Sequence, residues 1–149
     1  MSAASFFNNE QKQRIAKAIH DAELNTSGEI RVHIEEECKE DVMDHAAYIF
    51  ETLGIHKTKL RNGVLFYLAV KDHKFAILGD AGINAKAPEG FWDIIKAHML
   101  THFKNGHFTE GLCEGIMMAG EELKKDFPFL KDDTNELSNE MTFSKKKND

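Results

Sequence analysis

Hydrophobic patterning predicts a helix followed by a strand in the first quarter of the chain. Residues 29–35, EIRVHIE, alternate apolar side chains with charged or polar ones, which predicts a half-buried strand. Before this strand, apolar residues recur at helical spacing and predict a helix that Asn8 or Asn9 caps. Gln11 lies near its third position, as in a capping box, and the helix should end near residues 25–28.

A second helix and a strand hairpin follow. Asp41 is placed to cap a helix with one apolar face, and Gly54 to end it. The run Gly63–Val70 is almost continuously apolar, which is typical of a strand covered on both faces. Residues 71–73 form a short polar turn, and Lys74–Leu78 is the expected return strand.

Two further helices are predicted in the last part of the chain. Pro88 precedes an apolar periodicity over residues 89–105, and proline is favoured in the first turn of a helix. A second periodic segment covers Phe108–Lys125, with Thr109 as its expected N-cap.

The segment boundaries indicate one domain with an extension at either end. Residues 1–7 are expected to form an N-terminal extension and residues 8–130 the domain. Residues 131–149 are polar with few apolar anchors, and we expect a flexible polar tail.

This order of elements predicts an α/β fold. A helix between the first two strands makes them parallel, with a right-handed crossover, and the hairpin makes the third strand antiparallel to the second. The expected architecture is a three-layer α/β/α sandwich, in which a small mixed sheet has helices on both faces.

The predicted topology brings three strand ends to one edge of the sheet. The return strand ends at Gly79 and Asp80, which should lie near Arg61 and Asn62 before the second strand. Glu29, at the start of the first strand, should lie at the same edge. Two carboxylates with an amide and glycine carbonyls suit a hard cation such as Ca²⁺ or Mg²⁺. Arg61 could then hold a phosphate oxygen.

A purely structural interpretation of this edge is also open. In that case Gly79–Gly82 is a turn, Glu29 pairs with Arg61, and Asp80 caps the turn.

Composition narrows the class of protein. A chain of 149 residues with 42% hydrophobic and 30% charged residues fits one globular domain. A formal net charge of −6 argues against nucleic-acid binding. The apolar runs are too short to span a bilayer, and the N-terminus lacks the pattern of a signal peptide. Cys38 and Cys113 form no CxxC pair, so we expect a cytoplasmic location.

Two other polar groups are candidates for ion binding. His98 and His102 lie four residues apart, a spacing that zinc sites use, although a packing role is expected here. The acidic run Glu35–Glu37 ends the first strand, at the opposite sheet edge from Asp80. A cation site there is the alternative to a solvated strand end.

Several short motifs in this order resemble one known family. They are residues 22–23 with 26–30 (AE, TSGEI), 61–65 (RNGVL), 77–83 (ILGDAGI) with Trp92, and 103–108 (FKNGHF) with Gly111. The chain is similar to the TPM domain, the domain of the thylakoid lumen 18.3 kDa, Psb32 and MOLO-1 proteins. It resembles a stand-alone soluble member.

The resemblance implies a sandwich of Rossmann-like appearance, binding of a divalent metal with calcium as the reported ion, and weak acid phosphatase activity on phosphomonoesters. It strengthens the expectation of a metal site around Asp80, where the topology supplies Glu29 and Asn62 as further ligands. In the family's usual pattern a later acidic residue follows the glycines, and Asp93 could match it. Asp80 and Arg61 are the expected catalytic residues. The alternative is a non-catalytic, metal-stabilised scaffold that binds another protein.

Overall fold

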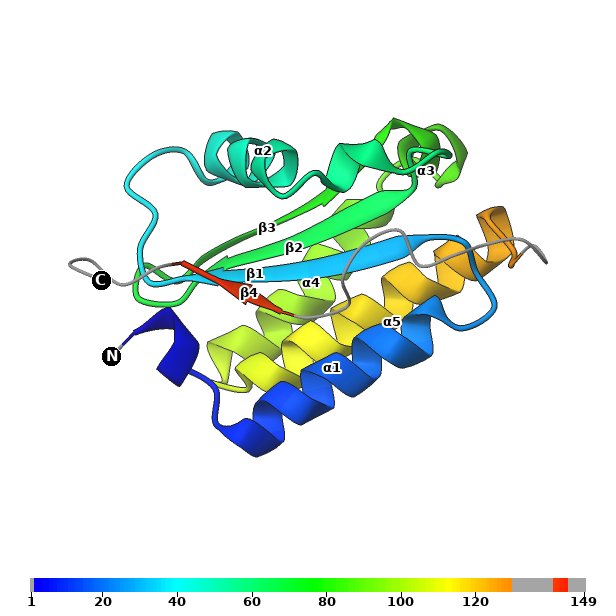
Figure 1. Ribbon diagram of the computed structural model, residues 1–149. Coiled ribbons are helices and arrows are strands. Elements are labelled where there is room, and N and C mark those ends of the chain that lie inside the picture. The colour runs from blue at the N-terminus through cyan, green and yellow to red at the C-terminus, as the bar shows by residue number, and fades with distance from the viewer. Residues whose placement is uncertain (1, 130–140, 145–149) are drawn as a thin grey trace.

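A computed structural model describes residues 2–129 and 141–144 and shows a mixed sheet with helices on both faces (Figure 1). The strands are β1 (Glu29–Glu35), β2 (Gly63–Ala69), β3 (Lys74–Gly79) and β4 (Thr142–Phe143), in the order β3-β2-β1-β4. β1 pairs in parallel with β2 and with β4, while β3 runs antiparallel to β2. The predicted α/β fold, a three-layer sandwich around a small mixed sheet, is confirmed.

The helices divide between the two faces of the sheet. On one face lie α1 (Asn9–Glu23), α4 (Phe91–Lys104) and α5 (Phe108–Asp126), and on the other lies α2 (Val42–Thr52) (Figure 1). The short helix α3 (Ala81–Lys86) directly follows β3. Within the described residues, no helix combines the length and apolar character needed to cross a bilayer.

Every residue of β2 is buried, as expected for a strand covered on both sides. Because side chains alternate along a strand, Val64, Phe66 and Leu68 join the core under α1 and α5. The intervening Leu65, Tyr67 and Ala69 pack with α2. This division explains why the β2 sequence shows no polar alternation.

The N-cap residues of two helices are those predicted from the sequence, whereas the N-cap of a third helix is a different residue. Asn8 and Gln11 form the predicted capping box of α1, and Asp41 accepts from two backbone amides of α2. Helix α5 starts one residue before the predicted cap. Its N-cap is His107, and Thr109 lies buried inside the first turn. The prediction of Thr109 as N-cap is therefore wrong.

Four elements were not predicted, and one of them is the 3-10 helix Ile55–Lys57 between α2 and β2. The short 3-10 helix Ala3–Ser5 lies in the expected N-terminal extension, and its Ala3 is buried in the core under α1. Helix α3 occupies a segment that the sequence suggested was a turn. Strand β4 lies within the expected polar tail, most of which is outside the described residues.

Candidate functional site

The three segment ends predicted to converge do meet at one edge of the sheet. We call this edge, formed by residues 27–29, 61–63 and 79–82, the Asp80 edge. The strand register pairs Glu29 with Gly63, and Val64 with Gly79. The amide of Asp80 donates to the carbonyl of Gly63 at 2.9 Å, and that of Glu29 to the carbonyl of Asn62 at 3.3 Å. The backbone therefore holds these segments against one another.

Asp80 and Arg61 form a two-point ion pair at this edge. Arg61 Nε donates to Asp80 Oδ2 at 2.7 Å, and Nη2 donates to Oδ1 at 2.8 Å. Oδ1 also accepts from the amide of Ala81 at 2.8 Å, so Asp80 caps α3. The aspartate side chain is 6% exposed and the arginine 52%. These hydrogen bonds, with the charge of Asp80, raise the pKa of Arg61.

Gly82 explains why the motif after β3 is rich in glycine. Its amide donates to the carbonyl of Arg61 at 2.8 Å. A Cβ atom at this position would overlap the carbonyl oxygen of Leu60 and lie 2.7 Å from that of Arg61. Only glycine lets α3 approach the 60–61 backbone this closely, and the approach places Asp80 opposite Arg61.

Asn62 and Glu29 lie deeper at the same edge. Asn62 is 1% exposed and its Nδ2 donates to Ser27 Oγ at 3.3 Å. Its buried Oδ1 has no hydrogen-bond partner among the described residues. Glu29 is 3% exposed. A buried amide oxygen without a donor is available to a cation, and hard cations favour such oxygens.

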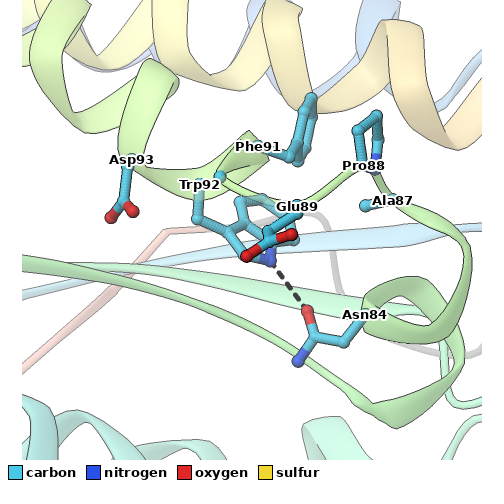
Figure 2. A pocket seen from close by; sticks show the side chains of 8 residues that line it. Asn84, Ala87, Pro88, Glu89, Phe91, Trp92 and Asp93 are labelled. Atoms are coloured by element: carbon cyan, nitrogen blue, oxygen red, sulfur yellow. Dashed lines mark hydrogen bonds between the residues drawn. The ribbon is translucent and has the colours of Figure 1, made fainter.

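Asp93, the fourth predicted metal ligand, does not lie at the Asp80 edge. It is in the first turn of α4 and lines a cavity of about 280 Å³ with Asn84 and Trp92 (Figure 2). Trp92 Nε1 donates to Asn84 Oδ1 at 2.7 Å, and Asn84 Nδ2 donates to the carbonyl of Gly79 at 2.8 Å. No described contact joins Asp93 to Asp80, so the structure does not bring this predicted ligand to the others.

A metal ion at the Asp80 edge would need ligands of two kinds, carboxylate oxygens and neutral oxygens. Across residues 2–129 and 141–144, no group of three or more His, Cys, Asp or Glu side chains is arranged to hold a metal ion. An ion at this edge would depend on neutral oxygens as well as carboxylates, as calcium sites commonly do.

A polar network that the sequence did not predict lies at the opposite end of the sheet. Glu35 accepts from Tyr67 Oη at 2.6 Å and from His45 Nε2 at 2.7 Å, and lies 3.2 Å from His33 Nε2. Burial would raise the pKa of Glu35, but the hydrogen bonds from His33 and Tyr67 and the nearby histidine charges lower it to about 2. The acidic run alone gave no sign of these partners, because they come from three separate segments.

His98 and His102 are held by a third residue from the neighbouring helix. His98 Nδ1 lies 2.8 Å from Glu114 Oε1, and His102 Nε2 lies 2.8 Å from Glu114 Oε2. The hydrogen bond from His102, more than that from His98, lowers the pKa of Glu114. Both rings are partly exposed, so they link α4 to α5 at the surface and not in the core.

The fold and the Asp80 edge define a three-layer α/β/α domain whose open sheet ends in a buried aspartate paired with a half-exposed arginine. The family model described as TPM domain matches residues 1–122, so the chain belongs to the TPM domain family. This confirms the resemblance found in the sequence.

Solved structures agree with this assignment. The chain is similar to the BA42 protein from the psychrophilic bacterium Bizionia argentinensis, determined by NMR, with 46% identity and a TM-score of 0.87. That match covers 94% of this chain and 97% of BA42. None of the curated proteins matches this chain.

Two more distant structures share the fold. The N-terminal domain of a protein from P. gingivalis has 20% identity and a TM-score of 0.69, covering 83% of this chain and 80% of that one. The N-terminal domain of the cg2496 protein from Corynebacterium glutamicum has 13% identity and a TM-score of 0.64. That match covers 79% of this chain and 74% of the cg2496 domain. At these identities the likeness concerns the fold alone.

Proposed function

We propose that this TPM domain binds one divalent cation, Ca²⁺ or Mg²⁺, at the Asp80 edge. The observation that carries the proposal is the buried Oδ1 of Asn62, which has no hydrogen-bond partner in the described part of the chain. It lies in a segment hydrogen-bonded to the segments of Asp80 and Glu29. A cation would supply the missing electrostatic partner, and family membership favours the same chemistry.

The ligands would be Asp80, Glu29 and Asn62, with backbone carbonyls and water completing the shell. Arg61 now occupies both oxygens of Asp80, so an ion would compete with the guanidinium for one carboxylate. Arg61 is half exposed, so its guanidinium can turn toward solvent when an ion replaces it at the carboxylate. We leave Asp93 out of this ligand set because it lines the cavity beside Asn84 and Trp92, away from the Asp80 edge.

Hydrolysis of phosphomonoesters is the proposed activity. When bound, the ion would act as a Lewis acid toward a phosphoryl oxygen. Arg61, with its planar guanidinium at the surface of the same edge, is suited to hold two further phosphate oxygens. Asp80 would position both the ion and Arg61. A single ion with few protein ligands is consistent with a weak activity.

A non-catalytic scaffold is the second candidate. It is favoured by the saturation of Asp80, whose oxygens accept from Arg61 and from the start of α3. In this role the ion would only stiffen α3 and the 60–63 segment, and the functional event would be contact with another protein.

Calorimetry of Ca²⁺ and Mg²⁺ binding tests the site. We expect Asp80→Asn to weaken binding at least tenfold, because the isosteric amide removes a charged ligand but still accepts from the Ala81 amide. Arg61→Ala should strengthen binding, because it removes the competing cation. Asp44→Asn, an exposed aspartate on α2, is the matched control and should leave binding unchanged. Equal affinity in Asp80→Asn and the unaltered protein would contradict the proposed site.

Activity separates the two candidates. If the site is catalytic, hydrolysis of p-nitrophenyl phosphate should stop in EDTA and return when Ca²⁺ or Mg²⁺ is restored. Arg61→Ala should then bind metal yet lose turnover. Metal binding without metal-dependent hydrolysis would favour the scaffold, and hydrolysis that is indifferent to EDTA would exclude the metal-dependent activity.

A further inference from the structure

Two cavities adjoin at the end of the sheet opposite the Asp80 edge. The first, of about 370 Å³, lies among the N-terminal segment, the β2–β3 turn and the start of α5. We call it the apolar cavity, and its lining comprises Phe6, Glu36, Val70, Lys71, His73 and Phe108. The second, of about 550 Å³, is the acidic cavity, and Glu35, Glu37, Glu40 and His45 are among its lining residues. Glu36 and Lys71 line both cavities, so the two adjoin at these residues, and we call them together the depression.

Aromatic side chains build the walls of the apolar cavity. The Phe6 ring meets Phe108 edge to face, with centroids 5.3 Å apart, and His73 meets the same Phe108 at 6.2 Å. His73 has a left-handed backbone, with φ of 55°, in the turn between β2 and β3. That strained turn places its imidazole against Phe108. Such a cavity suits a flat apolar group.

The charged side chains where the two cavities adjoin differ in whether they have an ion-pair partner. Lys71 Nζ lies 3.0 Å from Glu37, which is also 3.3 Å from Lys39, so these lysines already have a carboxylate partner. Glu35 is held by two histidines and a tyrosine. Among the described residues the carboxylate of Glu36 forms no direct hydrogen bond or ion pair. The hydrogen bond and charge of Glu37, and more weakly the charge of Glu36, raise the pKa of Lys71. Glu36 is the carboxylate left available where the apolar cavity adjoins the acidic one.

We propose that this depression binds a small amphiphilic amine, with its apolar body against Phe6, Val70 and Phe108 and its ammonium group at Glu36. Charge complementarity selects the cation: a carboxylate is available where the two cavities adjoin, while the lysine there is engaged by Glu37. Carboxylates outnumber lysines around the acidic cavity, which disfavours an anionic head group further. The site is distinct from the Asp80 edge and does not depend on metal binding there.

Amide NMR titration with three matched probes tests the proposal: 2-phenylethylamine, 2-phenylethanol and 3-phenylpropionate. The amine should shift the amides of Phe6, Glu36, residues 70–73 and Phe108, and leave those of residues 79–82 unchanged. Because exposed ion pairs contribute little, we expect the amine to bind about threefold to fivefold tighter than the alcohol, and the acid to bind weakest. Equal binding of all three probes, or shifts confined to another surface, would overturn the proposal.

Two variants separate the roles of charge and apolar contact. Glu36→Gln, at an exposed position that should not affect folding, should reduce amine binding to the level of the alcohol and leave alcohol binding unchanged. Glu10→Gln, an exposed glutamate on α1, is the control and should retain the preference for the amine. Phe108→Ala should weaken both probes, with its fold checked by circular dichroism. An undiminished amine preference in Glu36→Gln would refute the assigned head-group contact.

Discussion

Two carboxylates at opposite ends of the sheet, the buried Asp80 and the partly exposed Glu35, are stabilised by different partners. Asp80 is held by a guanidinium and a helix amide, so its charge is balanced by a group that can move into solvent. Glu35 is held by two imidazoles and a phenol that are themselves largely enclosed. Exchange of Arg61 for a metal ion is therefore feasible at Asp80, whereas Glu35 has a structural role that depends on pH.

Glu35→Gln should destabilise the protein in a pH-dependent way. The pKa of Glu35 is about 2 in the folded protein, against the usual 4.5 of a glutamate side chain. The folded state therefore binds fewer protons than the unfolded state between these values, and the stabilisation is present above pH 4.5 and is lost as the pH falls toward 2. We expect the variant to lose about 2 to 3 kcal/mol of unfolding free energy at pH 7.

Urea denaturation from pH 7 down to pH 2.5 measures this difference. The gap between the two proteins should narrow steadily below pH 4.5. Glu10→Gln, which removes an exposed carboxylate on α1, should show no comparable gap. A constant difference between Glu35→Gln and the unaltered protein at every pH would contradict the assigned charge network.

At the scale of elements, glycine contacts set how closely the layers approach. Gly82 allows α3 to reach the 60–61 backbone, and Gly115 lets α5 lie against Met99 of α4 and Phe66 of β2. Gly111 does the same against Phe103. The contacts of Gly111 and Gly115 lie largely on α4. The sequence could not indicate this, because the spacing of residues along a helix does not show which element the helix packs against.

Gly82→Ala should loosen α3. The added methyl group would overlap main-chain oxygen atoms that cannot rotate away, so α3 should shift and lose the Gly82-to-Arg61 hydrogen bond. We expect a loss of about 1 to 3 kcal/mol and faster amide hydrogen exchange over residues 81–86. Gly106→Ala is the control, because its φ of 78° costs about 1 kcal/mol but nothing lies near the new methyl group. Unchanged exchange in α3 would contradict this account.

At the scale of the whole molecule, much of the fold could be predicted from periodicity. The bounds of α1, β1 and β2 were predicted closely from their apolar patterns. The predicted half-burial of β1 is wrong, because every residue of β1 except Glu35 is buried, Arg31 and His33 included. Helix α3 was missed because six residues give little periodicity, and β4 because two residues far along the chain pair with β1. The topology also placed Asp80 beside Arg61 and Asn62, but the pairing of Arg61 with Asp80, and not with Glu29, depends on side-chain geometry.

The central claim is that the Asp80 edge is a divalent-cation site, and an amide NMR titration with CaCl₂ tests it most directly. We predict saturable shifts at residues 27–29, 61–63 and 79–82 that disappear in Asp80→Asn, while shifts at residues 35–40 remain small. Saturable shifts centred on residues 35–40, or shifts at the Asp80 edge that persist unchanged in Asp80→Asn, would contradict the account.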